Sequence, residues 1–298
     1  MKHFLSIEEL HPQTLSQLID RGISMKTRRG AHPELPLQDQ VWAMLFSKSS
    51  TRTRVSFEVG IRELGGSPMF LSSADIQLGR GEPIKDTARV LGRMVHGAII
   101  RTFDQQDVVD FAEYSGIPTI NALTDQEHPC QILADLMTIR EKLDRWQSRR
   151  IAFIGDGDNN MARSWMWAAK HLELELVVAA PESCLPPSEF MERLDAPNVT
   201  LTSDPVEAAT NADVINTDVW LSMGQEGQRE KEALFGAYQI NNELLAHAGP
   251  EHIVLHCLPA YRGKEISEEV LEAHADSIFQ QSENRLHAQK AVLYWLMK

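Results

Sequence analysis

Hydroxyl and guanidinium side chains are concentrated in one short segment, Ser50-Thr51-Arg52-Thr53-Arg54. It follows an apolar run at 41–46 and precedes a helical pattern, which predicts a strand that leads into a helix. Free backbone N–H groups, hydroxyls and positive charge at a helix start favour a bound phosphate. Arg52 and Arg54 point about 200° apart on a helix, so only one can face a ligand. We expect Arg52 to face it and Arg54 to pair with a nearby carboxylate; for the segment alone, the alternative is a capped surface helix with solvated arginines.

Other polar motifs also follow short apolar runs. In open parallel sheets, ligands bind beyond the carboxyl ends of the strands. We therefore expect the motifs of each half of the chain to meet at one sheet edge, and the two edges to face each other across an interdomain cleft. The motifs are the loop with Gln77, then Arg101, His128-Pro129-Cys130-Gln131, the loop from Gly155 to Asn160, Asp218 with Ser222-Met223-Gly224, and His256-Cys257-Leu258-Pro259-Ala260.

Apolar runs that alternate with helical patterns predict an α/β protein with two doubly wound parallel-sheet domains, joined by interdomain helices. We place a first domain at 1–146, completed by a C-terminal helix within 283–298, and a second at 147–282. The predicted strands are 41–46, 67–71, 97–101 and 119–121, followed by 150–154, 173–179, 199–202, 213–217, 253–256 and 277–279. Long helices are predicted at 132–146 and 283–297.

Composition narrows the possible partners and compartments. The chain has 298 residues and a net charge of −13, which repels nucleic acid and anionic membranes over most of the surface. Cys130, Cys184 and Cys257 are too few for a disulfide framework, and none lies in a C-x-x-C pair. Neither a signal peptide nor a run of ~20 apolar residues is apparent. We expect a cytoplasmic protein that captures an anionic substrate with local arginines.

Several of these motifs, in this order and at these separations, resemble the aspartate/ornithine carbamoyltransferase family over essentially the whole chain. Asp218-Val219-Trp220 with Ser222-Met223-Gly224, and Glu283-Asn284-Arg285, are similar to its ornithine branch. The resemblance implies transfer of a carbamoyl group from carbamoyl phosphate to the δ-amine of L-ornithine, giving L-citrulline and phosphate, in arginine metabolism. The motifs that carry it are Ser50-Thr51-Arg52-Thr53-Arg54, His128-Pro129-Cys130-Gln131 and His256-Cys257-Leu258-Pro259-Ala260.

The resemblance also assigns the donor site. Arg101 and His128 would stabilise the carbonyl oxygen, where negative charge grows as the amine attacks. A lone histidine is more often a surface or core residue, but Pro129 and Gln131 at a helix start favour a functional His128; the sequence leaves its protonation open. The implied carbamoyl phosphate-binding residues are Ser50, Thr51, Arg52, Thr53, Gln77, Arg101, His128, Pro129, Cys130, Gln131, Cys257, Leu258 and Arg285.

The acceptor carries an α-carboxylate, an α-ammonium and a distal amine. By the resemblance its site is formed by Asn160, Asp218, Ser222 and Met223, with Asp218 anchoring the α-ammonium. Taken singly, Asp218 could be a helix N-cap and Asn160 a turn residue.

Three groups, Arg101, His128 and Cys257, are predicted to act in catalysis, and Cys257 lies beside the reacting amine by the resemblance. A buried structural thiol is the alternative for Cys257. An amine with a pKa near 10.4 is mostly protonated at neutral pH. Departing phosphate can accept the proton, so we predict direct attack with no covalent intermediate, no protein base, no metal and no cofactor.

Two departures from the family pattern concern loops. Relatives carry Phe-Glu-Lys where this chain has Phe46-Ser47-Lys48, and Asp158 and Arg163 add charges near Asn160. A carbamoyltransferase for another amine, such as putrescine or acetylornithine, remains an alternative, as does a non-catalytic protein of the same fold. A dinucleotide-binding enzyme is disfavoured because Asn160 replaces the last glycine of G-x-G-x-x-G. The resemblance further implies a homo-oligomer, a trimer or a multiple of trimers, and leaves biosynthetic and catabolic roles open.

Overall fold

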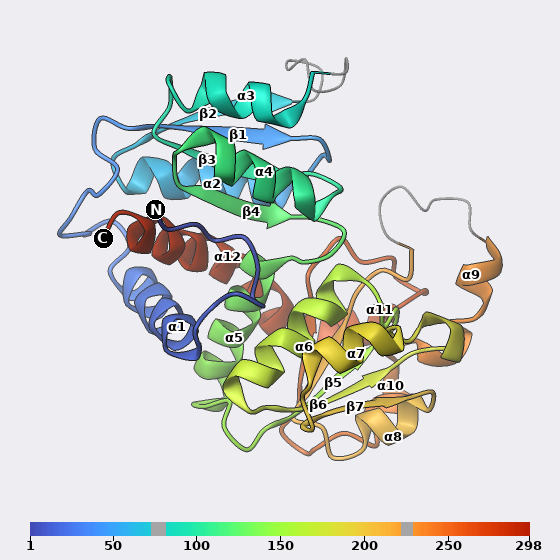
Figure 1. The fold of residues 1–298 in the computed structure, drawn as a ribbon. Helices are drawn as coiled ribbons and strands as arrows, with labels where there is room; N and C mark the ends of the chain where they lie inside the picture. Colours follow the sequence, from blue (N-terminus) through green and yellow to red (C-terminus); the bar gives the residue numbers. More distant parts are fainter. Residues whose placement is uncertain (73–81, 222–228) are drawn as a thin grey trace. The chain divides into compact units, whose positions relative to one another are not determined.

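The computed structural model describes residues 1–72, 82–221 and 229–298, which divide into two compact units. Unit 1 contains Met1–Met137 and Glu283–Lys298, and unit 2 contains Thr138–Ser282. The chain passes between the units within two helices, α5 (Pro129–Leu143) and α12 (Ala275–Leu296). Each unit has its own parallel sheet, which confirms the predicted fold class (Figure 1).

The described part of unit 1 is built on a four-stranded sheet in the order β2-β1-β3-β4. The strands are β1 (Val41–Phe46), β2 (Ser67–Ser72), β3 (Gly97–Arg101) and β4 (Thr119–Leu123), and all their pairings are parallel. Central strands β1 and β3 are apolar and almost wholly buried, as expected for strands covered on both faces. The predicted bounds of β1 and β3 are confirmed, and β2 and β4 extend one and two residues further.

Helices cover both faces of the unit 1 sheet. α3 (Ile84–Leu91) packs against α4 (Gln105–Ser115), so the two share a face. α2 (Thr51–Glu63) packs against α12, where Gly60 leaves room for the Lys290 stem. α1 (Pro12–Thr27) and α12 lie side by side, and Lys26 Nζ donates to Asn284 Oδ1 over 2.8 Å (Figure 1). The end of the chain is therefore part of unit 1.

The described part of unit 2 is built on a five-stranded parallel sheet in the order β7-β6-β5-β8-β9. Its strands are β5 (Arg150–Ile154), β6 (Glu175–Ala179), β7 (Val199–Thr202), β8 (Val214–Thr217) and β9 (Ile253–His256). α6 (Asn160–Leu172) packs on α7 (Ser188–Leu194), and α8 (Pro205–Ala209) on α10 (Asn242–Leu245). The other elements are η2 (Glu182–Cys184), α9 (Arg229–Ala233), η3 (Gly236–Tyr238) and α11 (Glu268–Ala273).

One predicted strand, 277–279, is wrong, because these residues lie inside α12. Ser277 and Ile278 are buried and Phe279 is exposed, which is a helical rather than an alternating pattern over the longer segment. The start of the predicted strand at 173 is also wrong, since Glu173 ends α6 in the left-handed conformation, with φ of 53°. A three-residue segment with two apolar residues, Ile278 and Phe279, cannot distinguish a strand from part of a buried helix.

The order of the strands locates the ligand-binding edges. In unit 1 the chain leaves neighbouring strands β1 and β3 in opposite directions, and in unit 2 it does so at β5 and β8. Such a switch point leaves a crevice at the carboxyl ends of the two strands. The predicted phosphate segment follows β1, and Asp218 follows β8.

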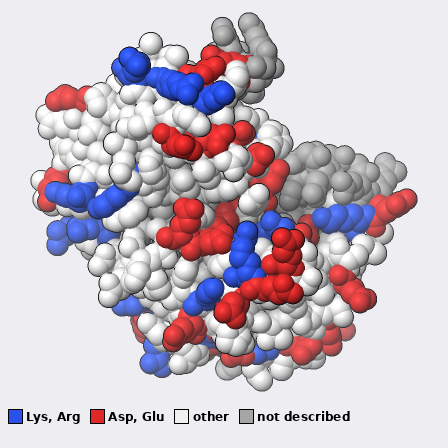
Figure 2. Space-filling model, viewed as in Figure 1, with Lys and Arg blue, Asp and Glu red and all other residues white. Residues whose placement is uncertain are grey.

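The described residues agree with two expectations from the composition, one on apolar helices and one on surface charge. None of the helices in the described ranges has the length and apolar character needed to cross a bilayer. On the face drawn in Figure 2, acidic side chains are spread over both units with basic side chains among them.

Candidate active site

The segment Ser50-Thr51-Arg52-Thr53 forms the turn from β1 into α2. β1 ends at Phe46 and α2 begins at Thr51, with Ser50 as the N-cap whose Oγ accepts from Thr53 N over 3.2 Å. The first turn of α2 therefore directs backbone N–H groups and the positive end of its dipole at the β1–β3 switch point. This is the local geometry that an anion requires.

Thr53 lies at the centre of the unit 1 site. Its fully buried hydroxyl contacts Ser50 Oγ at 2.9 Å, accepts from Arg285 Nη2 at 2.5 Å and lies 3.5 Å from Arg101 Nη1. Arg101 is the last residue of β3, and Arg285 belongs to α12. Three distant segments thus bring two buried guanidinium groups to one hydroxyl at the start of a helix.

The two arginines of α2 have different surroundings. Arg54 Nε donates to Glu58 Oε1 over 2.7 Å, and its guanidinium lies 3.7 Å from the Phe70 ring centroid. The prediction that Arg54 pairs with a carboxylate is confirmed. Arg52 Nε is buried and has no hydrogen-bond partner among the described residues. A buried donor without a partner is costly unless a ligand satisfies it, so Arg52 is the better candidate for phosphate.

His128 immediately precedes α5, which begins at Pro129. Its ring is buried, and burial lowers its pKa well below the ordinary value, with further lowering by the positive charges of Arg285 and Arg101. The imidazole is therefore neutral at pH 7. A neutral ring next to two arginines can donate one N–H to a carbonyl oxygen without adding a third positive charge.

The two residues after Pro129 differ in what they can offer a ligand. Cys130 Sγ donates to Asn121 O over 3.4 Å, and burial raises the pKa of this thiol to about 12. Cys130 is therefore an unreactive thiol whose side chain is held by β4. Gln131 Nε2 donates to Asp135 Oδ1 over 2.8 Å, whereas Gln131 Oε1 is buried with no hydrogen-bond partner in the described ranges. That oxygen can accept from an amide NH2 group.

In unit 2, the loop from β5 into α6 contacts the residue that follows β8. Asn159 is the N-cap of α6: its Oδ1 accepts from Ala162 N over 2.8 Å, and its Nδ2 lies 3.5 Å from Asp218 Oδ2. Asn160 is the first residue of α6. The N-cap of α6 is therefore Asn159, and Asp218 contacts this capping residue from the end of β8.

Asp218 and Cys257 lie together at the carboxyl ends of β8 and β9. Cys257 Sγ donates to Asp218 Oδ1 over 3.0 Å, and Val219 N donates to the same oxygen over 2.7 Å. Asp218 is 8% exposed, and burial raises its pKa. A buried carboxylate with a raised pKa favours a cationic ligand, because an added positive charge would stabilise its ionised form.

Sequence reasoning missed a buried pair next to this cluster, His256 and Glu265. His256 Nε2 lies 3.1 Å from Glu265 Oε1, and Leu258 N donates to His256 Nδ1 over 2.9 Å. Since a backbone N–H can only donate, Nδ1 accepts, and the ring is the neutral tautomer with its proton on Nε2. The nine-residue separation gives no periodic signal that could have revealed the pair.

The same cluster has the composition of a metal site. The ligand atoms of Asp218, His256 and Cys257 lie within 4.8 Å of one another. Both ring nitrogens of His256 are hydrogen-bonded, and the Cys257 thiol donates to Asp218. These hydrogen bonds account for the positions of all three side chains, so we interpret the cluster as a hydrogen-bonded network.

The structure also accounts for the two departures in sequence. Lys48 is buried, pairs with Asp125 and lies 4.2 Å from the Phe103 ring centroid, while Ser47 N donates to Arg101 O over 2.8 Å. The added charges pair with each other, since Arg163 Nη2 donates to Asp158 Oδ1 over 2.8 Å. Neither departure leaves an uncompensated charge.

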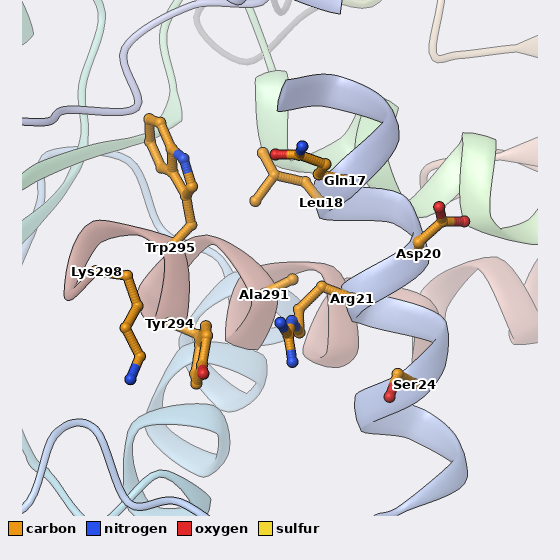
Figure 3. A pocket seen from close by; sticks show the side chains of 9 residues that line it. All are labelled: Gln17, Leu18, Asp20, Arg21, Ser24, Ala291, Tyr294, Trp295 and Lys298. Atoms are coloured by element: carbon orange, nitrogen blue, oxygen red, sulfur yellow. The ribbon is translucent and has the colours of Figure 1, made fainter. Parts of the chain in front are cut away.

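Three predicted site residues, Gln77, Ser222 and Met223, lie outside the described residues. The others fall into two groups, one in each unit, and the interdomain cleft stays a prediction. A separate pocket of about 570 Å³ lies in unit 1 between α1 and α12 (Figure 3). It is lined by Arg21, Tyr294, Trp295 and Lys298 among others, and by none of the predicted site residues.

Two family models match consecutive parts of the chain. Residues 2–141 match "Aspartate/ornithine carbamoyltransferase, carbamoyl-P binding domain", and residues 147–296 match "Aspartate/ornithine carbamoyltransferase, Asp/Orn binding domain". The ornithine carbamoyltransferase of Akkermansia muciniphila is 64% identical, over 98% of this chain and 97% of its own. That of Geobacter sulfurreducens is 47% identical over 100% of both chains.

Solved structures of high similarity agree with these matches. The crystal structure of anabolic ornithine carbamoyltransferase from Campylobacter jejuni has a TM-score of 0.93 and 42% identity, covering 99% of each chain. Ornithine carbamoyltransferase from Pyrococcus furiosus has a TM-score of 0.91 and 41% identity, covering 98% of this chain and 96% of its own.

Proposed function

The chain belongs to the aspartate/ornithine carbamoyltransferase family, and we propose that it transfers the carbamoyl group of carbamoyl phosphate to the δ-amine of L-ornithine. The products are L-citrulline and phosphate. The convergence of Ser50, Arg101 and Arg285 on Thr53 at the start of α2 carries the donor half of this proposal. Relatives named ornithine carbamoyltransferase, 64% and 47% identical over nearly the full length, support the acceptor half.

The proposed donor site divides into a phosphate end and a carbamoyl end. The phosphate end uses the first turn of α2 with Gln77 and Arg285, where hydroxyls, N–H groups and guanidinium groups all donate. At the carbamoyl end, Arg101 and neutral His128 donate to the carbonyl oxygen, and Gln131 Oε1 accepts from the NH2 group. Backbone groups of Pro129, Cys130 and Leu258, and the Cys257 side chain, complete the set.

The proposed acceptor site uses Asn160, Asp218, Ser222 and Met223. Ionised Asp218 holds the α-ammonium of ornithine, and Cys257 directs the δ-amine while it keeps its hydrogen bond to Asp218. Because Asp218 is buried, the ammonium both satisfies its charge and lowers its pKa. Putrescine lacks the α-carboxylate and acetylornithine has an acylated α-amine, so each loses part of this recognition.

The reaction follows from the electron flow that these groups favour. The lone pair of the neutral δ-amine forms a bond to the carbonyl carbon, and the carbonyl π electrons move to the oxygen that faces Arg101 and His128. When the carbonyl re-forms, the bond from carbon to the phosphate oxygen breaks. Phosphate leaves with that electron pair and takes the proton of the attacking nitrogen, so no side-chain base is needed. Preorganised donors at a developing oxyanion are the main source of acceleration here.

One assay tests this function directly. The protein is incubated with carbamoyl phosphate and, separately, L-ornithine, acetylornithine, putrescine and aspartate, and both ureido product and phosphate are measured. We expect citrulline from ornithine alone. Product from a different amine would replace the acceptor assignment and leave the donor site intact, whereas failure with all four would overturn the enzymatic function.

We also propose the setting of the reaction. The related enzyme from Campylobacter jejuni is an anabolic ornithine carbamoyltransferase, which supports a role in arginine biosynthesis for this chain. We propose a cytoplasmic homo-oligomer, a trimer or a multiple of trimers. Restored growth of an arginine-requiring strain that lacks its own enzyme tests the role, and sedimentation equilibrium tests the assembly, where a monomer would contradict it.

We propose that the units carry separate parts of the reaction. The carbamoyl phosphate-binding part comprises 1–146 with the C-terminal helix at 283–298, and the ornithine-binding part comprises 147–282. The separate family models for 2–141 and 147–296 support a boundary near 146, and the grouping of Glu283–Lys298 with Met1–Met137 in one compact unit supports the place of the C-terminal helix. Substitutions of site residues in the first part should then raise KM for carbamoyl phosphate more than KM for ornithine. Substitutions at Asn160 and Asp218 in the second part should do the reverse, whereas Cys257 and Leu258 are proposed to contact carbamoyl phosphate from the second part.

A further inference from the structure

An ion pair between a buried carboxylate and a half-buried lysine links the loop after β5 to α9 within unit 2. Lys231 Nζ donates to Asp156 Oδ2 over 2.6 Å, and Asp156 Oδ1 lies 3.5 Å from Asp158 N. Asp156 is 4% exposed, and burial raises its pKa, while the hydrogen bond from Lys231 opposes that shift. Neither residue belongs to the donor or acceptor site proposed above. Asp156 nevertheless lies in the loop that leads to Asn160, so the pair needs its own explanation.

The loop that carries Asp156 has little freedom to move. Gly155 has φ of 150°, which side chains rarely permit. A Cβ at Gly157 would lie 3.0 Å from Ala180 Cβ and 3.1 Å from Cys184 O. The loop thus packs closely on the end of β6, and the Asp156 carboxylate is its buried polar anchor.

The far end of this loop reaches the acceptor site. Asn159 follows Asp156 by three residues, caps α6 and approaches Asp218, which in turn accepts from Cys257. A change in the position of Asp156 is therefore passed along a short chain of contacts to the carboxylate proposed to bind the α-ammonium. α6 and Asn160 follow immediately.

We propose that Lys231 is a positioning residue for the amine acceptor, and that its ion pair with Asp156 holds the loop at 155–160 so that Asn159 and Asn160 meet Asp218 in the binding geometry. This inference rests on the proposed function, because it names a residue that sets the affinity of the same acceptor site. Lys231 itself does not touch the substrate. If the loop at 155–160 is displaced, we expect the affinity for the acceptor to fall more than any other property.

The same helix offers a matched control. Glu232, the next residue of α9, pairs with Lys264, and both side chains are more exposed than Asp156, at 27% and 49%. This second pair also links α9 to another part of unit 2, but within the described ranges it forms no hydrogen bond or ion pair with the loop at 155–160. If the pair of Lys231 with Asp156 served only to fix α9, loss of either pair would have a similar effect on acceptor binding.

The test compares Lys231→Met, Lys231→Arg, Glu232→Gln and the double variant Asp156→Asn with Lys231→Met. Lys231→Met should raise KM for the acceptor by up to about 100-fold, the loss that a misplacement of about 1 Å can cause. KM for carbamoyl phosphate should change less than about twofold on the same grounds. Lys231→Arg should restore most of the acceptor affinity, and Glu232→Gln should match the unmodified protein.

The double variant separates position from stability. It removes both charges, so its urea midpoint should exceed that of Lys231→Met, where Asp156 is left without its partner. Its KM for the acceptor should nevertheless stay high, because the link to α9 is missing. Full recovery of both quantities would overturn the proposal, as would equal losses for both substrates in Lys231→Met, or a comparable effect of Glu232→Gln.

The unmodified protein is assayed first, so that a failure of the proposed reaction can be told apart from a failure of the proposed role of Lys231. If it uses another of the four amines, KM is measured for that amine. L-ornithine binding is also measured by calorimetry with inorganic phosphate in place of carbamoyl phosphate, a mixture that cannot react. Turnover failure combined with ornithine binding weakened by Lys231→Met would reject the reaction alone, whereas absence of any ornithine binding in the unmodified protein would reject both proposals.

Discussion

The two arginines at the start of α2 provide a sharp test of the donor site, because they are two residues apart and face different surroundings. Arg52 Nε is buried with no hydrogen-bond partner in the described part of the chain. Arg54 is bound to Glu58, packs on Phe70 and is 48% exposed. We predict that Arg52→Met weakens the hold on phosphate and that Arg54→Met does not.

The magnitude follows from the type of interaction lost. A hydrogen bond to a charged group contributes ~1.5–3 kcal/mol, which corresponds to a rise of about 10- to 150-fold in KM for carbamoyl phosphate at ~1.4 kcal/mol per tenfold. Arg54→Met removes a helix-surface ion pair with Glu58 that contributes ~0.3–0.5 kcal/mol to stability. We expect it to change phosphate affinity less than about twofold, since so small a local change leaves the N-cap at Ser50 in place.

Initial rates at saturating ornithine, with carbamoyl phosphate varied, give KM for both variants. Inhibition by inorganic phosphate measures the same contact without the carbamoyl group, and urea midpoints check that both variants are folded. If Arg54→Met raised KM as much as Arg52→Met, the assignment of one ligand-facing arginine would be wrong.

Three further predictions concern catalysis and pH. Arg101→Ala should lower kcat far more than it weakens ornithine binding, because charge on the carbonyl oxygen grows only as the amine attacks; equal losses would contradict its role at the oxyanion. Cys257→Ser keeps a donor to Asp218, so kcat should fall less than about tenfold, the cost of one altered hydrogen bond, whereas a variant inactive at every pH would support a covalent or base role for the thiol. Burial, and then the charges of Lys290, Lys26 and Arg29, lower the pKa of His287 to about 3. Between about pH 6.5 and pH 3 the unfolded chain therefore binds a proton at His287 and the folded chain does not. The free energy of unfolding should fall by up to ~1.4 kcal/mol per pH unit as the pH drops through this range. His287→Gln should remove this part of the pH dependence in urea titrations, and an unchanged slope would contradict the prediction.

The sheets could be predicted from the sequence because each central strand is a short apolar run that ends at polar residues. Phe46 is followed by Ser47, and Ile154 by Gly155 and Asp156, so the strand ends are marked by the residues themselves. The prediction of a strand at 277–279 is wrong even though polar residues, Asp276 and Gln280, flank this segment as well. Its place inside α12 depends on packing contacts such as Ser277 Oγ with Val254 O, at 2.7 Å, which a local pattern cannot contain.

The local parts of the site were predictable, and the tertiary parts were not. Ser50 as an N-cap and the pairing of Arg54 follow from helical spacing. Thr53 contacts Arg101, which is 48 positions away in the sequence, and Arg285, which is 232 positions away. No periodic pattern in the sequence can predict contacts over such separations. The neutral state of His128 likewise depends on burial and on those same two arginines, which become neighbours only in the fold.

The discontinuity of unit 1 has a consequence for how the protein is made. Arg285 lies in the segment Glu283–Lys298, which completes unit 1 only after all of Thr138–Ser282 has been synthesised. At ~5–20 residues per second, those intervening residues, about 145 of them, take roughly 7–30 s to translate. Throughout that interval the nascent chain carries the β1–α2 turn without Arg285, one of the two arginines that reach Thr53. Unit 1 is therefore finished last on the ribosome, although nearly all of it is translated first.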